Sequence, residues 1–299
     1  MWLWMAICSA FLLGFYDVFK KKASQNNGVL SVLLFATGIS TVCFMPLILS
    51  SLFGWGLADG TLLTMGHGEP TDHLWLVLKS TIVTISWITG LLGLKHLPIT
   101  TASTMKATRP VFILLGGILI FGEKLNLNQW IGIVTSIVAL YLLGRSSRKE
   151  GIVFSNNKWV WLMGVSIISG AASAMIDKNI MKWMTPMFAQ SWSNFYITVI
   201  LAATTGICSL ARGSLLEKFH WDWYIFLIAL FLTISDFLYF FALSVEGSMI
   251  SVVSMLRRSA VIVTFLCGVI FFKERRIREK ALALAILLTG MAILVFGSR

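Results

Sequence analysis

Long apolar stretches are the feature that most restricts the fold of this chain. Roughly 20 mostly apolar residues are needed for a helix to cross about 30 Å of hydrocarbon. Ten such stretches can be drawn, with little sequence between them: 1–19, 28–53, 74–94, 98–121, 128–144, 158–176, 187–211, 221–243, 247–272 and 280–297. The sequence therefore predicts an all-α membrane protein with ten transmembrane helices and no soluble catalytic domain.

The charges are few and unevenly placed. Only 12% of the residues are charged, whereas soluble chains have about 25%. The net charge is +11, and most basic residues fall in short loops, where they serve orientation and lipid headgroups and do not indicate a nucleic-acid partner. Odd-numbered loops carry fourteen Lys and Arg, and even-numbered loops and tails carry four. The positive-inside rule then favours odd-numbered loops in the cytoplasm and both termini outside, and the opposite orientation stays open.

Catalytic and metal-binding patterns are missing from the sequence. There is no HExxH, GxSxG or P-loop lysine motif. The four cysteines lie inside apolar stretches, and the four histidines lie in or beside loops without ligand spacing. We expect no metal site, no cofactor and no enzymatic activity.

The chain also contains an internal repeat. Residues 98–143 align with residues 249–294 at a shift of 151 without a gap, which places Lys106 on Arg257. A weaker pairing places 9–17 on 169–177. An odd number of crossings in each half would invert the second half, and inverted repeats are typical of secondary transporters that hold substrate near the midplane. We expect a first five-helix repeat at 1–144, a connecting loop at 145–157 and a second, inverted five-helix repeat at 158–299.

Charged residues inside the predicted helices indicate where cargo would bind. Lys106 and Arg109 lie three residues apart, and Arg257 and Arg258 are adjacent within apolar sequence. An arginine at the bilayer centre costs about 3 kcal/mol on insertion scales, and intramembrane ionisable residues commonly mark a substrate or ion path. Asp236 is the one clear embedded anion on this interpretation, so internal pairing would leave excess positive charge. That excess favours an anionic cargo, since arginine binds phosphate or carboxylate through two parallel hydrogen bonds.

Two other interpretations of these residues stay open. The charges can form structural ion pairs, or long side chains can reach the membrane interface. Tyr239 follows Asp236 by three residues and shares its helix face, which makes it a candidate cargo contact. Asp236 itself is a candidate proton site or counter-ion.

At these residues the chain resembles the drug/metabolite transporter superfamily, including its EamA-type bacterial members. The resemblance covers the whole chain and includes the segments IFGEK (120–124) and FFKER (271–275). Within the superfamily, KATRP (106–110) and RRSAVI (257–262) are similar to segments of the triose-phosphate translocators, although Arg109 stands where those proteins have Glu. That likeness implies a phosphate-binding role for Lys106, Arg257 and Arg258. It also makes Lys21 and Lys22 candidates, since the translocators have a Lys-Lys pair at the end of their first helix.

The sequence thus predicts a multi-pass protein of the bacterial inner membrane, in contact with membrane lipid. Its expected function is secondary transport of a small organic anion, phosphorylated or nucleotide-linked, by alternating access. One alternative is an EamA-type exporter of amino acids or other neutral or drug-like metabolites. Another is a lipid-linked role, either flipping a lipid phosphate or serving an envelope enzyme as a subunit.

Overall fold

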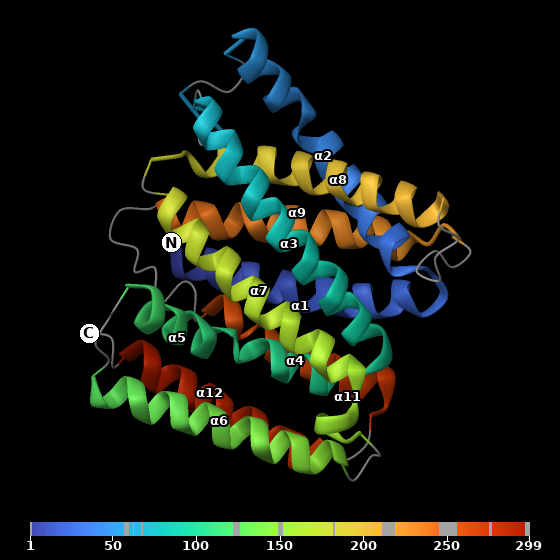
Figure 1. Ribbon diagram of the computed structural model, residues 1–299, viewed down its shortest axis with the longest axis vertical. Helices are drawn as coiled ribbons and strands as arrows, with labels where there is room; N and C mark the ends of the chain where they lie inside the picture. Colours follow the sequence, from blue (N-terminus) through green and yellow to red (C-terminus); the bar gives the residue numbers. More distant parts are fainter. Residues whose placement is uncertain are drawn as a thin grey trace.

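In the computed structural model every regular element of the described part of the chain is a helix. The described residues are 2–56, 60–61, 63–66, 68–121, 126–148, 152–181, 183–210, 219–244, 256–274 and 277–296, and they contain no strand. The elements are α1 (Trp2–Asn26), α2 (Val29–Phe53), α3 (Pro70–His96), α4 (Ile99–Ala107), α5 (Arg109–Phe121), α6 (Leu127–Arg148), the 3-10 turn η1 (Phe154–Asn156), α7 (Lys158–Ile180), α8 (Pro186–Leu210), α9 (Trp223–Ser244), α11 (Ala260–Phe272) and α12 (Ile277–Phe296). Helical residues 256–258 precede α11 (Figure 1).

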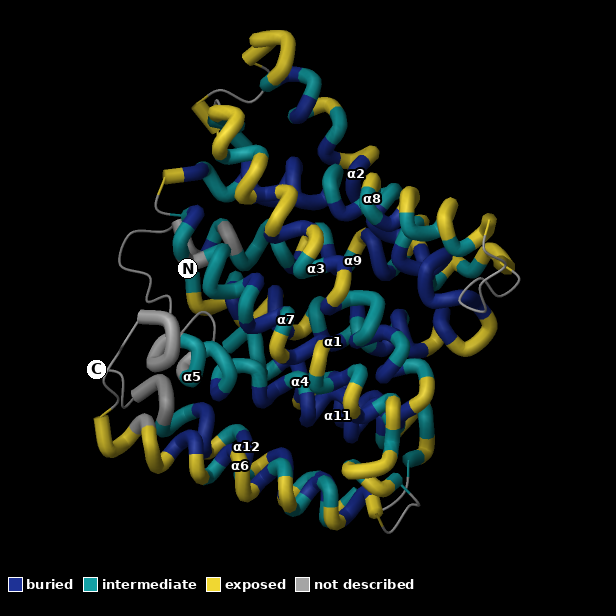
Figure 2. Tube along the Cα trace, viewed as in Figure 1, coloured by how far each residue is buried: buried dark blue, intermediate teal, exposed yellow. Residues whose placement is uncertain are grey.

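Six helices in this described part are long and apolar enough to cross a membrane: α1, α2, α3, α6, α7 and α8. A shorter apolar segment lies in α9, at Trp223–Tyr239. The all-α membrane class is therefore confirmed, while the full set of ten crossings stays a prediction. Exposed positions on the helices carry many large apolar side chains, such as Trp4, Val42 and Phe271, as expected of surfaces that face lipid (Figure 2).

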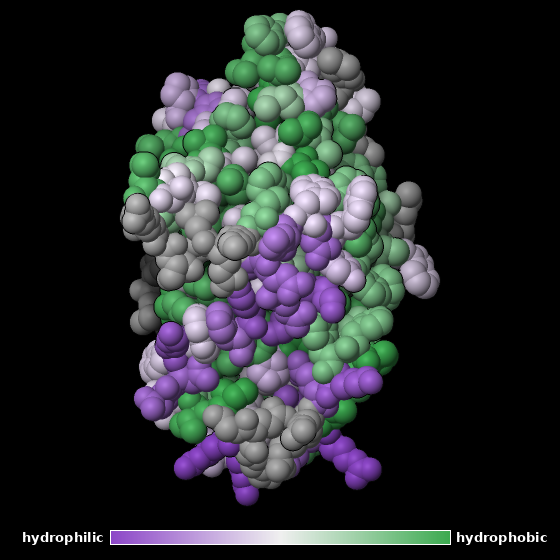
Figure 3. Space-filling view, turned by 90° about the vertical axis from the view of Figure 1, so that its right-hand side faces the viewer, coloured by the Kyte–Doolittle hydropathy of each residue, from purple (hydrophilic) through white to green (hydrophobic). Residues whose placement is uncertain are grey.

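Most helices run between two ends of the molecule. We call one of them the basic end: it is where α1, α3, α6, α8 and α11 finish and where α2, α4, α7, α9 and α12 begin, on the right of Figure 1. Seen face-on, this end shows a concentration of hydrophilic side chains between apolar flanks (Figure 3). The helices pack in pairs drawn from the two halves of the chain: α1 with α9, α3 with α7, α2 with α8, and α6 with α12.

Paired serines hold two of these crossings. Where α1 meets α9, Ser9 Oγ donates to the Ser235 carbonyl at 2.7 Å, and Ser235 Oγ donates to the Ser9 carbonyl at 2.8 Å. Where α3 meets α7, Ser86 and Ser166 make the same reciprocal bonds at 2.7 and 2.6 Å. Small side chains let helix backbones approach closely in a membrane, and their hydroxyls bond across the gap. The two crossings are therefore built alike.

Candidate functional site

The helix expected around Lys106 is interrupted. The backbone N–H and the Oγ1 of Thr108 both donate to the Met105 carbonyl, at 3.1 and 2.6 Å. Pro110 has no N–H with which to continue the helical ladder, so the chain ends α4 and starts α5 here. The prediction of one continuous helix over this segment was wrong. The break places Lys106 and Arg109 on either side of a helix junction, the kind of discontinuous helix that lines transporter sites.

The same break occurs 151 residues later. Ser259 donates through its N–H and Oγ to the Leu256 carbonyl at 3.0 and 2.6 Å. The N–H of Ile262 then bonds the Ser259 carbonyl at 2.8 Å, as the N–H of Val111 bonds the Thr108 carbonyl at 3.0 Å. The two adjacent arginines lie in the turn before this second break. Equivalent local geometry thus surrounds the basic residues of both halves.

Lys106 has a carboxylate partner on another helix. Its Nζ lies 2.8 Å from Oδ1 of Asp17 in α1, and both side chains are about one-fifth exposed, at 20% and 18%. Asp236 is the one clear embedded anion in the sequence prediction, and the structure corrects this by adding Asp17. The lysine therefore does not face the interior as an uncompensated charge.

Arg257 is held from two sides. Its Nη2 donates to Oδ1 of Asp236 in α9. Its guanidinium also lies over the Tyr239 ring, 4.2 Å from the centroid. A cation over an aromatic face is attracted by the ring quadrupole. The structure thus brings together Arg257, Asp236 and Tyr239, all three of which the sequence singled out.

Arg109 and Arg258 lie in the same region without a carboxylate partner among the described residues. Arg109 Nε is buried and has no hydrogen-bond partner there, and its guanidinium lies so close to Gly170 of α7 that a methyl group at that position would overlap it. Arg109 interacts electrostatically with Asp17 and Arg257, and Arg258 interacts with Arg109 and Arg257. These electrostatic interactions link the basic residues of the two halves into one charged cluster.

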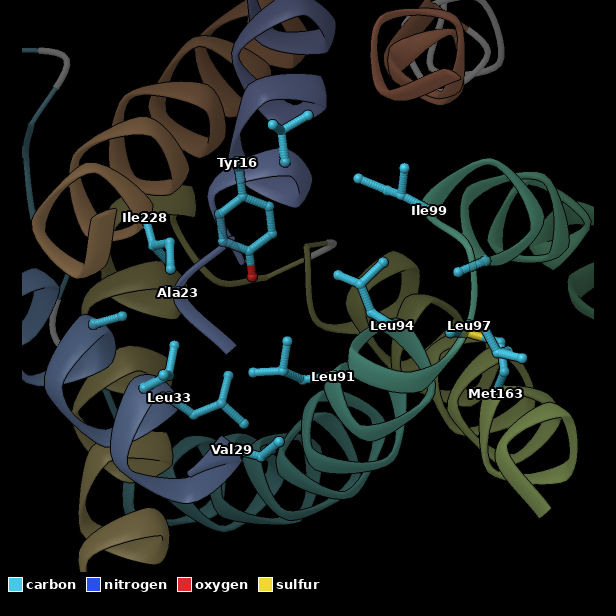
Figure 4. Packing of buried hydrophobic residues seen from close by; sticks show 14 of the residues in the cluster. Tyr16, Ala23, Val29, Leu33, Leu91, Leu94, Leu97, Ile99, Met163 and Ile228 are labelled. Carbon is cyan, nitrogen blue, oxygen red and sulfur yellow. The ribbon is translucent and has the colours of Figure 1, made fainter. Parts of the chain in front are cut away.

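Lys20 is a member of this cluster that the sequence analysis missed. Its side chain is buried at 4% exposure, and its Nζ donates to the Tyr16 hydroxyl at 3.0 Å. The ammonium also lies 5.7 Å from the Trp87 ring centroid and interacts electrostatically with Lys106. Figure 4 shows Tyr16 within the central packing cluster, its hydroxyl directed away from α1. Helical spacing could have indicated this position, because residues 16, 17 and 20 share one face.

Lys21 and Lys22 lie in α1, which continues to Asn26, seven residues beyond the end expected at 19. Lys21 is buried, and its Nζ donates to the carbonyls of Leu94, Lys95 and Leu97 at 2.5, 3.0 and 2.7 Å. These carbonyls are at the C-terminal end of α3, where a cation is favoured by the helix dipole. Lys22 is exposed. The structure therefore separates these two lysines in environment, and neither joins the charged cluster directly.

A metal centre finds no support in the described part of the chain, where no group of three or more His, Cys, Asp or Glu residues could hold an ion. The charged cluster is instead rich in lysines and arginines. Their side chains supply hydrogen-bond donors and positive charge without any acceptor.

Comparison with known proteins agrees with the helical architecture. Residues 1–145 match the EamA-like transporter family. An uncharacterized transporter of Pseudomonas aeruginosa is 27% identical over 126 residues, which cover 42% of this chain and 40% of that protein. The match thus spans less than half the length of this relative.

A solved crystal structure shares the fold. Its sequence is 16% identical, and it superposes with a TM-score of 0.59. The match covers 98% of this chain and 94% of the chain in that structure. The sequence matches are to transporters, and the apolar helices support a multi-pass membrane protein.

Proposed function

We propose that this protein is a secondary transporter that carries a small organic anion by alternating access. The observation that carries the proposal is the charge of the cluster. Five cations, Lys20, Lys106, Arg109, Arg257 and Arg258, surround two carboxylates, Asp17 and Asp236. Among the described residues the formal charges of this cluster sum to +3, so an anion that enters would be attracted strongly in a medium of low dielectric.

Two ion pairs occupy part of the charged cluster. Asp17 holds Lys106, and Asp236 holds Arg257. An entering anion would compete with these carboxylates for the same donors, while Arg109 Nε has no hydrogen-bond partner among the described residues. Phosphate suits such a site because its oxygens accept the paired N–H donors of a guanidinium. We therefore assign cargo binding first to Arg258 and Arg109, with Lys106 and Arg257 joining them.

The other sequence candidates take different roles in this proposal. Lys21 holds the end of α3 through three carbonyls, and Lys22 faces outward, so we assign neither to the cargo. Tyr239 positions the Arg257 guanidinium by stacking beneath it. Asp236 acts as the counter-ion of that arginine.

Two inverted five-helix repeats would explain the packing of the chain. The equivalent helix breaks at Thr108 and Ser259 support this arrangement. The helix pairing supports it too: α7 and α9 would be the counterparts of α1 and α3, and α1 packs with α9 as α7 packs with α3. With repeats at 1–144 and 158–299, a pseudo-twofold axis in the membrane plane would bring the basic residues to equivalent depths. The basic end would face the cytoplasm of a bacterial inner membrane.

Transport by purified protein in liposomes tests the proposal. We expect uptake of labelled organic phosphates, competed by inorganic phosphate, and a loss of uptake on the order of tenfold or more in Arg258→Gln. Lys22→Gln is the matched control because it removes an exposed positive charge outside the cluster. Equal uptake by Arg258→Gln and the parent protein would contradict the assignment.

An exporter of neutral or drug-like metabolites is the second candidate. The pairing of Lys106 and Arg257 with carboxylates favours it, since paired charges need no anionic cargo. It predicts that uptake assays with neutral metabolites succeed where phosphates fail. It also predicts that Arg258→Gln lowers stability without changing cargo preference.

A further inference from the structure

A glutamate after α11 closes onto the start of α4. Its two carboxylate oxygens accept the first free N–H groups of that helix: Glu274 Oε1 from Ile99 and Oε2 from Thr100, the latter at 3.2 Å. The Thr100 hydroxyl also donates to Oε2. A carboxylate at a helix N-terminus satisfies N–H groups that have no partner within the helix and meets the positive end of the helix dipole.

The surrounding contacts hold this arrangement tightly. Lys280 of α12 is fully buried, and its Nζ lies 3.7 Å from Glu274 Oε2. Gly268 of α11 packs directly on the same turn of α4, where an added Cβ would lie 2.8 Å from the Cγ2 atoms of both Ile99 and Thr100. The close approach of α4 and α11 and the carboxylate bonds therefore form one unit at the basic end.

This unit joins the two halves of the chain. The start of α4 belongs to the first half, and Glu274 and Gly268 belong to the second. In contrast, the hydrogen bonds of Lys21 to the end of α3 lie within the first half, and only its electrostatic interaction with Glu274 reaches the second. Separation of α4 from α11 would remove every acceptor that Glu274 offers to α4.

We propose that Glu274 is a latch that holds the basic end shut, and that its release from the start of α4 is the step that opens this end. The inference rests on the transporter architecture and does not depend on the charge of the cargo. Bonds to a charged group contribute more than neutral ones, so the latch would favour the closed population by a factor on the order of ten or more.

Cys267 provides a native reporter for the test. It is buried, it precedes Gly268 in α11, and it belongs to the same packing cluster as Leu97 and Ile99. Replacing Cys8, Cys43 and Cys208 by Ala leaves a single thiol at the interface of α4 and α11. Its rate of reaction with a membrane-impermeant maleimide, measured separately from each side of the membrane, reports opening of the basic end without any cargo.

Glu274→Gln should raise this rate on the order of tenfold, from one side of the membrane only. Gly268→Ala should also raise it, because the added methyl group separates α4 from α11 while Glu274 stays intact. Asp222→Asn is the matched control: Asp222 Oδ1 accepts the Tyr224 N–H at 3.1 Å, so this carboxylate caps α9 within its own half at the same end. The rate of maleimide reaction in Asp222→Asn should match that of the parent protein.

Three results would overturn the proposal. The first is an unchanged rate of maleimide reaction in a Glu274→Gln protein that still unfolds cooperatively. The second is an equal increase in Asp222→Asn, which would indicate general loosening. The third is an increase from both sides of the membrane. If Glu274→Gln does not fold, Thr100→Val decides the question by the same rate, because it removes the hydroxyl that donates to Glu274 Oε2. Since the readout needs no substrate, a failed latch and a failed assignment of anionic cargo give separate results.

Discussion

Lys106 Nζ lies 2.8 Å from Asp17 Oδ1, so the helix break of the first half is tied to α1 by a partly buried ion pair. The second half has a counterpart, in which Arg257 is tied to α9 through Asp236. Each cation lies just before a helix break. Asp17 belongs to α1 and Asp236 to α9, and these two helices pack on one another through Ser9 and Ser235. The charged cluster is therefore part of the framework that connects the two halves.

Breaking the first pair should cost stability. Asp17→Asn leaves Lys106 without its partner, and removing one member of a buried pair costs about 3 kcal/mol. The double variant Asp17→Asn/Lys106→Gln should recover part of this loss, because no unpaired charge is left. Thermal unfolding in detergent measures the effect. Additive losses in the double variant would show that the two groups do not interact.

Gly170 should control the position of Arg109. A methyl group in Gly170→Ala would overlap the guanidinium and displace it, so phosphate uptake should fall as it does in Arg109→Gln. Combining the two changes should cause little further loss, because both act on one side chain. Gly164→Ala in the same helix is the control, since nothing lies within 4 Å of its added Cβ. Full activity of Gly170→Ala would argue against a cargo role for Arg109.

Lys21 and Lys22 should differ although they are adjacent. Lys21→Met leaves three carbonyls without their shared donor and should lower the free energy of unfolding by about 2 kcal/mol. Lys22→Met affects an exposed side chain and should change the free energy of unfolding by less than about 0.5 kcal/mol. Melting temperatures of the two variants, measured side by side, distinguish a structural lysine from an outward-facing one. Equal values would contradict the assignment of Lys21 to α3.

The serine crossings should tolerate loss of the hydroxyl better than gain of bulk. Ser235→Ala removes bonds that are worth about 0.6 kcal/mol each in membrane proteins, so its effect should be small. Ser235→Leu would push α1 away from α9 and should destabilise the fold by several times that amount. Comparison of the two melting temperatures tests whether close approach or hydrogen bonding dominates. A larger loss in Ser235→Ala would reverse this ranking.

The sequence by itself determined the class of protein and most of the helices. Hydrocarbon thickness sets the length of an apolar span, and local composition shows it directly, so α2 ends at Phe53 as its apolar stretch does. The repeat at a shift of 151 likewise pointed to Lys106 and Arg257 as equivalent, and both precede equivalent helix breaks.

Only the tertiary structure decided which charges meet. Asp17 and Lys106 are 89 residues apart, and nothing local to either one indicates the pairing. Lys20 and Lys21 resembled loop residues because they follow the apolar stretch, yet packing against α3 keeps them helical and buried. The reason is physical: the lipid selects spans by local hydrophobicity, whereas the partner of a buried charge depends on how the helices pack.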